Sequence, residues 1–73
     1  AADDIAALAD HDDWQVRGYV AIALGEIGTE KHRPVLKRLM QDSEEKVAQA
    51  ADQALGQLQS RLAYGESPTT QPA

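Results

Sequence analysis

The sequence contains an internal repeat that limits the folds open to this chain. Shifted by 31 positions and laid on itself, the sequence shows five identical pairs: Leu8/Leu39, Val16/Val47, Ala23/Ala54, Leu24/Leu55 and Gly25/Gly56. Three similar pairs accompany them: Ile5/Leu36, Asp13/Glu44 and Ile27/Leu58. Two unrelated amphipathic helices would not keep one spacing across a helix, a turn and a second helix. The repeat therefore predicts two copies of one structural unit.

Each unit is predicted to be a pair of helices. In the long helix of the first unit, apolar residues recur at helical spacing on one side: Val16, Val20, Ala23, Leu24 and Ile27. The last helix does the same with Val47, Ala51, Ala54, Leu55, Leu58 and Leu62. Shorter helices are expected around the stripe Ile5, Leu8 and Ala9, and from about Glu30 to Met40 with Pro34 in the first turn. The expected fold class is all-α, with four helices in two stacked hairpins.

Turn residues set the expected ends of these helices. Asp12 or Asp13 is expected to cap the helix that begins at Trp14, and Gly28 to end it in a left-handed conformation. Ser43 is expected to cap the last helix. The domain is expected over 1–63, with repeats at about 2–28 and 29–62 and a disordered tail at 64–73.

Both units resemble the HEAT repeat family, and in particular the short repeats first described in phycobilisome lyase subunits. Residues 9–28 and 40–58 are similar to the second helix and its preceding turn. Val16-Arg17 matches the Val-Arg pair of the family, and residues 23–28 match its Leu-Gly ending. Ala48 replaces the arginine in the second unit. The resemblance implies an α-solenoid segment and a role in protein–protein interaction, without naming a partner.

Length and composition argue against an enzyme. A chain of 73 residues has room for one small core and no deep catalytic cleft. It contains no cysteine, so disulfides, thiolate nucleophiles and cysteine metal sites are excluded. His11 and His32 lie on different polar segments with no nucleophile at a suitable spacing. No catalytic residue and no cofactor is expected.

Charge narrows the range of partners. The net charge of −5 argues against nucleic acid and against anionic membrane surfaces. The acidic run of residues 10–13 has neither the alternating ligands nor the glycine of a calcium loop, so a solvated turn is expected there and no metal. No apolar stretch is long enough to cross a membrane. The sequence does not indicate a cellular compartment.

One side of the helix at 14–27 is unusually apolar and differs from its counterpart. Opposite the apolar stripe lie Trp14, Gly18, Ala21 and Gly25, flanked by Tyr19 and Ile22. The equivalent residues of the second unit are mainly polar: Glu45, Gln49, Asp52, Gly56, Ala50 and Gln53. Small residues let another helix approach, and Trp and Tyr are typical interface anchors. These six residues are candidates for partner binding, and packing within the domain is the alternative.

Arg17 is expected to join a ladder of charges along the turns, as the family resemblance implies. Its acceptor is expected to be Asp13, one turn back, or Glu44 in the next unit. This ladder would fix the register between repeats, and partner binding is the alternative role for Arg17.

Two units are fewer than the three or so that a repeat array usually needs. The expected partner is therefore another protein or a second copy of this chain, in a homo-oligomer or as a fragment of a longer repeat protein. Beginning at Ala1 without a methionine fits a processed form or a fragment. The family resemblance also allows an accessory or chaperone-like subunit of an enzyme such as a bilin lyase.

Overall fold

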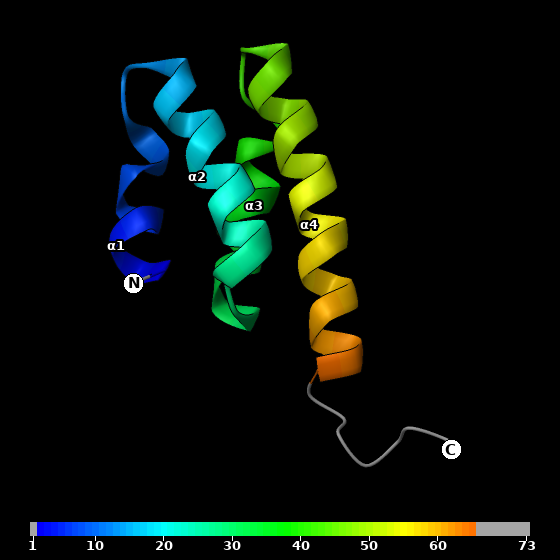
Figure 1. Cartoon of the computed structure of the whole chain (residues 1–73). Coiled ribbons are helices and arrows are strands. Elements are labelled where there is room, and N and C mark those ends of the chain that lie inside the picture. Colours follow the sequence, from blue (N-terminus) through cyan, green and yellow to red (C-terminus); the bar gives the residue numbers. More distant parts are fainter. Residues whose placement is uncertain (1, 66–73) are drawn as a thin grey trace, which may run out of the picture.

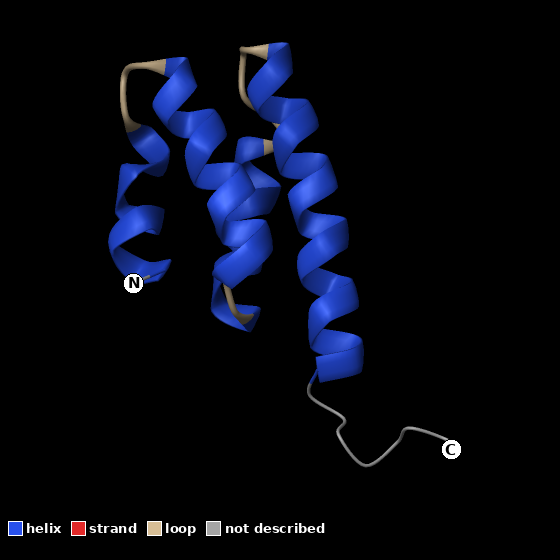
Figure 2. Ribbon diagram, viewed as in Figure 1, coloured by secondary structure: helices blue, strands red, loops and turns tan. Residues whose placement is uncertain are grey.

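The computed structural model describes residues 2–65. Its elements in chain order are α1 (Ala2–Ala6), the 3-10 helix η1 (Ala7–Asp10), α2 (Trp14–Ile27), the 3-10 helix η2 (Glu30–His32), α3 (Arg33–Leu39) and α4 (Glu45–Gly65). Figure 1 shows two hairpins side by side, α1 with α2 and α3 with α4. Only helices and short loops make up the described residues (Figure 2). The predicted all-α fold of two stacked hairpins is confirmed.

The core lies between the hairpins. Its largest fully buried side chains come from α2, α3 and α4: Leu24, Leu36, Leu58, Val20 and Val47. Full burial of such a side chain contributes about 1.5–3 kcal/mol. The long helices α2 and α4 share the most extensive contact in the molecule. Small residues on both sides, such as Ala21 and Ala51, let these helices approach closely.

The N-terminal cap of α2 is the one expected from the sequence, but the conformation at its C-terminal end is not. Asp13 caps the helix as expected, because its Oδ1 accepts a hydrogen bond from Gln15 N at 2.9 Å. Gly28 ends the helix, but in an extended conformation with φ −70° and ψ 169°, so the expected left-handed cap is wrong. Glycine fits here for another reason, since a Cβ atom would collide with the carbonyl oxygen of Leu24.

The turns before α2 and α4 are built alike. Before α2, Nδ1 of His11 accepts a hydrogen bond from Asp13 N at 3.0 Å. Before α4, Oδ1 of Asp42 accepts one from Glu44 N at 2.8 Å. This hydrogen bond of Asp42 orders the turn before α4. The cap expected of Ser43 stays a prediction. His11 and Asp42 are 31 positions apart, so the repeat extends to the hydrogen bonds of the turns.

The second hairpin begins at Glu30, as expected, and its last helix runs further than expected. Its first helix begins as η2, where Thr29 and His32 form a reciprocal capping box, and Pro34 lies in the first turn of α3 as predicted. The helix α4 continues to Gly65, past the expected domain end at residue 63. Residues 66–73 of the predicted disordered tail lie outside the described residues.

Candidate protein-interaction surface

Four of the six candidate interface residues lie inside the domain. Ala21 and Gly25 are buried, and Trp14 and Gly18 are half-buried. A Cβ atom on Gly25 would lie 2.9 Å from Cα of Ala54, so the two helix backbones pass very close together at this point. The side of α2 expected to bind a partner therefore packs on α4, which favours the internal-packing alternative for these four residues.

Trp14 packs at the edge of this contact. Its ring lies against the core, and Nζ of Lys46 is 5.5 Å from the ring centroid. A lysine ammonium at this distance from an indole makes a cation–π contact. Trp14 therefore helps to join the start of α2 to the start of α4.

Tyr19 and Ile22 remain on the surface. Tyr19 is 60% exposed and Ile22 is 53% exposed. The two residues are three apart on α2, so their side chains are neighbours on one face. Beside Ile22 is a shallow hollow of about 160 Å³ whose other lining residues belong to α4: Ala50, Gln53, Ala54 and Gln57. We call the surface of Tyr19, Ile22 and this hollow the α2–α4 patch.

Arg17 binds across the repeats, but to a different acceptor than expected. Its Nε and Nη2 donate to the two carboxylate oxygens of Asp42, at 2.7 and 3.0 Å. Its Nη1 donates to the carbonyl oxygens of His11 and Asp12. These hydrogen bonds from Arg17, and one from the backbone of Glu44, hold the pKa of Asp42 below its ordinary value, although burial opposes the shift.

The expected ladder of Asp13, Arg17 and Glu44 is therefore corrected. Asp13 uses its carboxylate to cap α2, and Glu44 takes part through its backbone N–H. Arg17 binds Asp42 because the two oxygens of this carboxylate match the two N–H groups that the guanidinium presents side by side. All three guanidinium nitrogens of Arg17 donate within the domain, which supports its role in register between repeats.

Arg61 makes a second link that the sequence reasoning missed. Its guanidinium donates to the carbonyl oxygens of Gly25, at 3.1 and 3.3 Å, and of Gly28, at 2.8 Å. The last carbonyls of a helix have no partner within the helix, and a cation there also interacts favourably with the helix dipole. No local pattern marks Arg61 for this contact, because its two acceptors lie 36 and 33 positions away in the sequence.

An ion pair and a hydrogen bond join α1 to the start of the second hairpin. Asp3 accepts hydrogen bonds from Nζ of Lys31 at 3.1 Å and from Nε2 of His32 at 3.0 Å. The ring of His32 is buried and its Nδ1 accepts from Thr29 N, so the proton lies on Nε2, facing Asp3. The hydrogen bond from Lys31, followed by that from His32, lowers the pKa of Asp3. These contacts serve to position α1.

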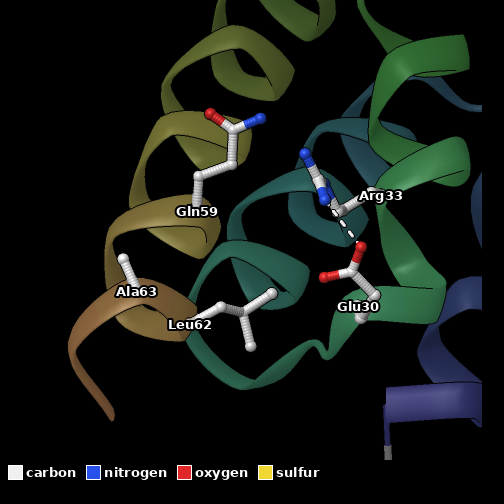
Figure 3. Close-up of a pocket in the computed structure, with 5 residues that line it drawn as sticks. All are labelled: Glu30, Arg33, Gln59, Leu62 and Ala63. Atoms are coloured by element: carbon white, nitrogen blue, oxygen red, sulfur yellow. Dashed lines mark hydrogen bonds and ion pairs between the residues drawn. The ribbon is translucent and has the colours of Figure 1, made fainter. Parts of the chain in front are cut away.

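The hollow lined by Glu30 and Arg33 offers no catalytic arrangement. It measures about 540 Å³ and lies between the start of the second hairpin and the end of α4 (Figure 3). Nη1 of Arg33 donates to Oε2 of Glu30 at 2.6 Å, so the charged groups of the hollow are paired with each other. The facing residues from α4 are Gln59, Leu62 and Ala63. This lining contains no nucleophilic side chain, and its one carboxylate, that of Glu30, is held by Arg33.

Residues 2–65 hold neither a cluster of metal ligands nor a membrane-spanning helix. No three His, Asp or Glu side chains of this part of the chain gather closely enough to hold a metal ion. No helix among these residues is long and apolar enough to cross a membrane.

Comparison with protein families matches the model of HEAT repeats over residues 2–68. The match covers both hairpins, in agreement with the internal repeat of the sequence. Comparison with curated proteins and with solved structures gives no significant match. Members of the matched family typically mediate protein–protein contacts or act as scaffolds, and are typically non-catalytic.

Proposed function

Because the chain belongs to the HEAT repeat family, we propose that it is a protein–protein interaction module that binds a partner protein through the α2–α4 patch. The observation that carries this proposal is the pair Tyr19 and Ile22, two large side chains more than half exposed and adjacent on α2. The other four candidate residues, Trp14, Gly18, Ala21 and Gly25, pack on the side of α2 that faces α4. Tyr19 and Ile22 are therefore the members still available to a partner.

The chemistry of the patch suits a partner that presents one apolar side chain surrounded by polar groups. Burial of a side chain such as Ile22 releases about 1.5–3 kcal/mol, and tyrosine is among the residues enriched at interface hot spots. The hollow beside Ile22 has Ala50 and Ala54 in its lining, with Gln53 and Gln57 offering amide groups. An apolar side chain of the partner fits the alanine surface, and backbone groups beside it can bond the glutamines.

The repeats themselves are proposed to be of the short type found in phycobilisome lyase subunits, at about 2–28 and 29–62. The constant offset of 31 positions between equivalent residues, and the matched turns at His11 and Asp42, support this assignment.

The proposal is tested by site-specific photocrosslinking followed by titration. A benzophenone amino acid is placed at position 19 in one variant and at position 52 in another, because Asp52 lies on the exposed polar side of α4. Both are incubated with extract of the source cells, and the partner crosslinked at position 19 is identified and purified. Its affinity is then measured for the unmodified chain and for Tyr19→Ser/Ile22→Ser.

We expect crosslinking at position 19 and not at 52, and at least a tenfold loss of affinity in the double variant, which corresponds to about 1.4 kcal/mol. The matched control is Gln49→Ser/Asp52→Ser on the polar side, which should bind normally. Equal affinity of the unmodified chain and Tyr19→Ser/Ile22→Ser would exclude the patch as the binding site.

A further inference from the structure

The hollow shown in Figure 3 continues along α3. A second hollow of about 460 Å³ shares Glu30 and Arg33 with it and adds Pro34 and Lys37. The two hollows therefore form one depression, with the first helix of repeat two on one side and the end of α4 on the other. We call this depression the α3–α4 groove. Glu30 and Lys37 are seven positions apart, which is about 10 Å along a helix.

The side of repeat two that contains this groove is polar where the same side of repeat one is packed. Gly18 and Ala21 lie on the side of α2 that packs against α4. Their equivalents on α4, Gln49 and Asp52, are exposed polar residues. Gln59, which lines the groove, follows Asp52 by two helical turns and so lies on the same side of α4. A polar outer side is typical of a repeat on which no like repeat stacks.

The acids that pair one repeat with the other also have no counterpart on this side. Asp3 and Asp10 of repeat one form ion pairs with a lysine and an arginine of repeat two. Their equivalents in repeat two, Pro34 and Gln41, carry no charge. This side therefore lacks the two acids, and two of the small residues, that hold repeat one against repeat two. The α3–α4 groove has a chemistry of its own.

The groove lies in a basic stretch of an acidic chain. Residues 30–38 contain four of the seven Lys and Arg residues and one acid, Glu30, which gives this stretch a net charge of +3. The other residues contain three Lys or Arg and eleven Asp or Glu, a net charge of −8, so that the whole chain carries −5. Attraction for an acidic partner is therefore concentrated at the first helix of repeat two.

Two cations of the groove keep donors for a partner. Lys37 is exposed and forms no ion pair within residues 2–65. Arg33 donates from Nη1 to Glu30 at 2.6 Å, but its buried Nε has no acceptor among these residues. By contrast, Arg17 and Arg61 donate to acceptors inside the domain. Lys37 and Arg33 are therefore the groups of the groove that can bind carboxylates.

The wall of the groove on α4 supplies an apolar surface. Leu62 is half-buried and Ala63 is exposed. In Figure 3, the side chain of Leu62 extends from α4 toward the Glu30–Arg33 pair. An apolar side chain placed here is removed from water together with part of Leu62. The groove thus has an apolar wall on α4 and a cationic wall on α3.

From these observations we propose that the α3–α4 groove binds an acidic peptide segment of a partner protein. One apolar side chain of the segment packs on Leu62 and Ala63, and carboxylates beside it bind Lys37 and Arg33. The length of about 10 Å matches about three residues of an extended peptide. A nucleic acid suits the groove less well, because Glu30 borders it and the acidic remainder of the chain repels a polyanion.

The groove shares no lining residue with the α2–α4 patch, so either proposal can fail without the other. The test begins with a selection of random peptides displayed on phage against Tyr19→Ser/Ile22→Ser, in which the patch is disabled. We expect the selected peptides to carry several Asp or Glu residues around one apolar residue. The most enriched peptide is then made with a fluorescent label, and its Kd is measured by anisotropy. A selection without enrichment of acidic peptides overturns the proposal.

Substitution of the free cation tests the charge of the groove. Lys37→Gln should weaken binding of the labelled peptide by about fivefold, because it removes a charged donor. The matched control is Lys46→Gln, which makes the same change at an exposed lysine outside the groove and should bind within about twofold of the unmodified chain. Glu30→Gln removes a repelling carboxylate beside Arg33 and should tighten binding by about threefold. Equal affinity of Lys37→Gln and the unmodified chain overturns the proposal, and so does weaker binding by Glu30→Gln.

An added acid tests the apolar wall. Ala63→Glu should weaken binding by about fivefold or more, because it places a carboxylate where the apolar side chain packs. Ser60→Glu is the matched control, since Ser60 is exposed on the same helix and does not line the groove. If Ala63→Glu and Ser60→Glu bind the peptide equally well, the α4 wall is not part of the site and the proposal is wrong.

Three further measurements decide between occupants. A single-stranded oligonucleotide of the same net charge should displace the labelled peptide far less well, and equal competition would overturn the choice of a peptide. Deletion of residues 66–73 should leave the affinity unchanged, whereas a tenfold rise would assign the groove to this segment of the chain itself. Light scattering should give the same molar mass for the unmodified chain and for Lys37→Gln. A dimer that dissociates on Lys37→Gln would assign the groove to a second copy.

Discussion

The two repeats share one pattern of residues and differ in what surrounds them. Val20 and Leu24 of α2 and Val47 and Leu58 of α4 are all fully buried. Yet Leu8 and Ile27 are 42% and 50% exposed, while their equivalents, Leu39 and Leu58, are enclosed, because repeat one lies against repeat two on one side only. The burial of a residue in a repeat protein is therefore set by the neighbouring unit as much as by its own place in the pattern.

The sharpest test of this comparison is one substitution at two equivalent positions. Leu39→Ala should lower the free energy of unfolding by about 2–5 kcal/mol, because it leaves a cavity in the core. Leu8→Ala should cost well under half as much, because Leu8 is 42% exposed. Urea denaturation followed by circular dichroism measures both. Equal losses would mean that Leu8 is enclosed in solution.

The glycines at equivalent positions should respond with opposite signs. Gly25→Ala places a Cβ atom 2.9 Å from Cα of Ala54 and should cost about 1–3 kcal/mol. Gly56→Ala meets no atom within 4 Å on the described residues and should stabilise the helix by up to about 1 kcal/mol. The comparison fails if the Gly25→Ala variant unfolds at the same urea concentration as the unmodified chain or at a higher one.

Removal of the carboxylate that binds Arg17 should have an intermediate effect that depends on pH. The pKa of Asp42 is lowered in the folded state, so its contribution is fully present above the ordinary value of 3.8 and is lost as the pH falls toward the lowered value. Asp42→Asn should therefore lower the melting temperature by several degrees at neutral pH and weaken the acid dependence of stability.

Asp3 provides the control for this pH dependence, since its pKa is also lowered but its carboxylate is exposed. Asp3→Asn should have a smaller effect than Asp42→Asn on the melting temperature at neutral pH and on the fall of the melting temperature at acid pH. If the melting temperature of Asp42→Asn falls with decreasing pH as steeply as that of the unmodified chain, the Arg17–Asp42 pair does not form in solution.

The smallest effect on stability is expected at the α2–α4 patch. Tyr19→Ser and Ile22→Ser should each change the free energy of unfolding by only about 0.5 kcal/mol, because both side chains are mainly exposed. Trp14→Ala should cost clearly more, since Trp14 packs against the core. Thermal unfolding of the three variants ranks them. A loss at Tyr19 as large as that at Trp14 would show that Tyr19 belongs to the core.

Much of the fold was predictable because helical periodicity and capping are local. The repeated apolar pattern, the helix at 14–27, the cap at Asp13 and the place of Pro34 all depend on residues close in sequence. The conformation of Gly28 was predicted wrongly because glycine at a helix end usually adopts the left-handed form, whereas here it allows close approach of the Leu24 carbonyl.

The candidate surface was only partly predictable. A helical wheel identifies the sides of α2 but not which of them meets another helix. It therefore groups the buried or half-buried Trp14, Gly18, Ala21 and Gly25 with the exposed Tyr19 and Ile22. The long-range acceptors were missed for the same reason. Asp42 is 25 positions from Arg17, and Gly25 is 36 positions from Arg61, so neither distance follows from local rules.

The sequence by itself determined that this chain forms two like helical hairpins, because the spacing of apolar residues and the turn residues act within each helix and its caps. The packing of one hairpin on the other decided which apolar residues are enclosed, which acid Arg17 binds, and which surfaces remain open. These outcomes depend on atoms brought together across 25 or more positions of the chain, and only the stacked arrangement places them within reach.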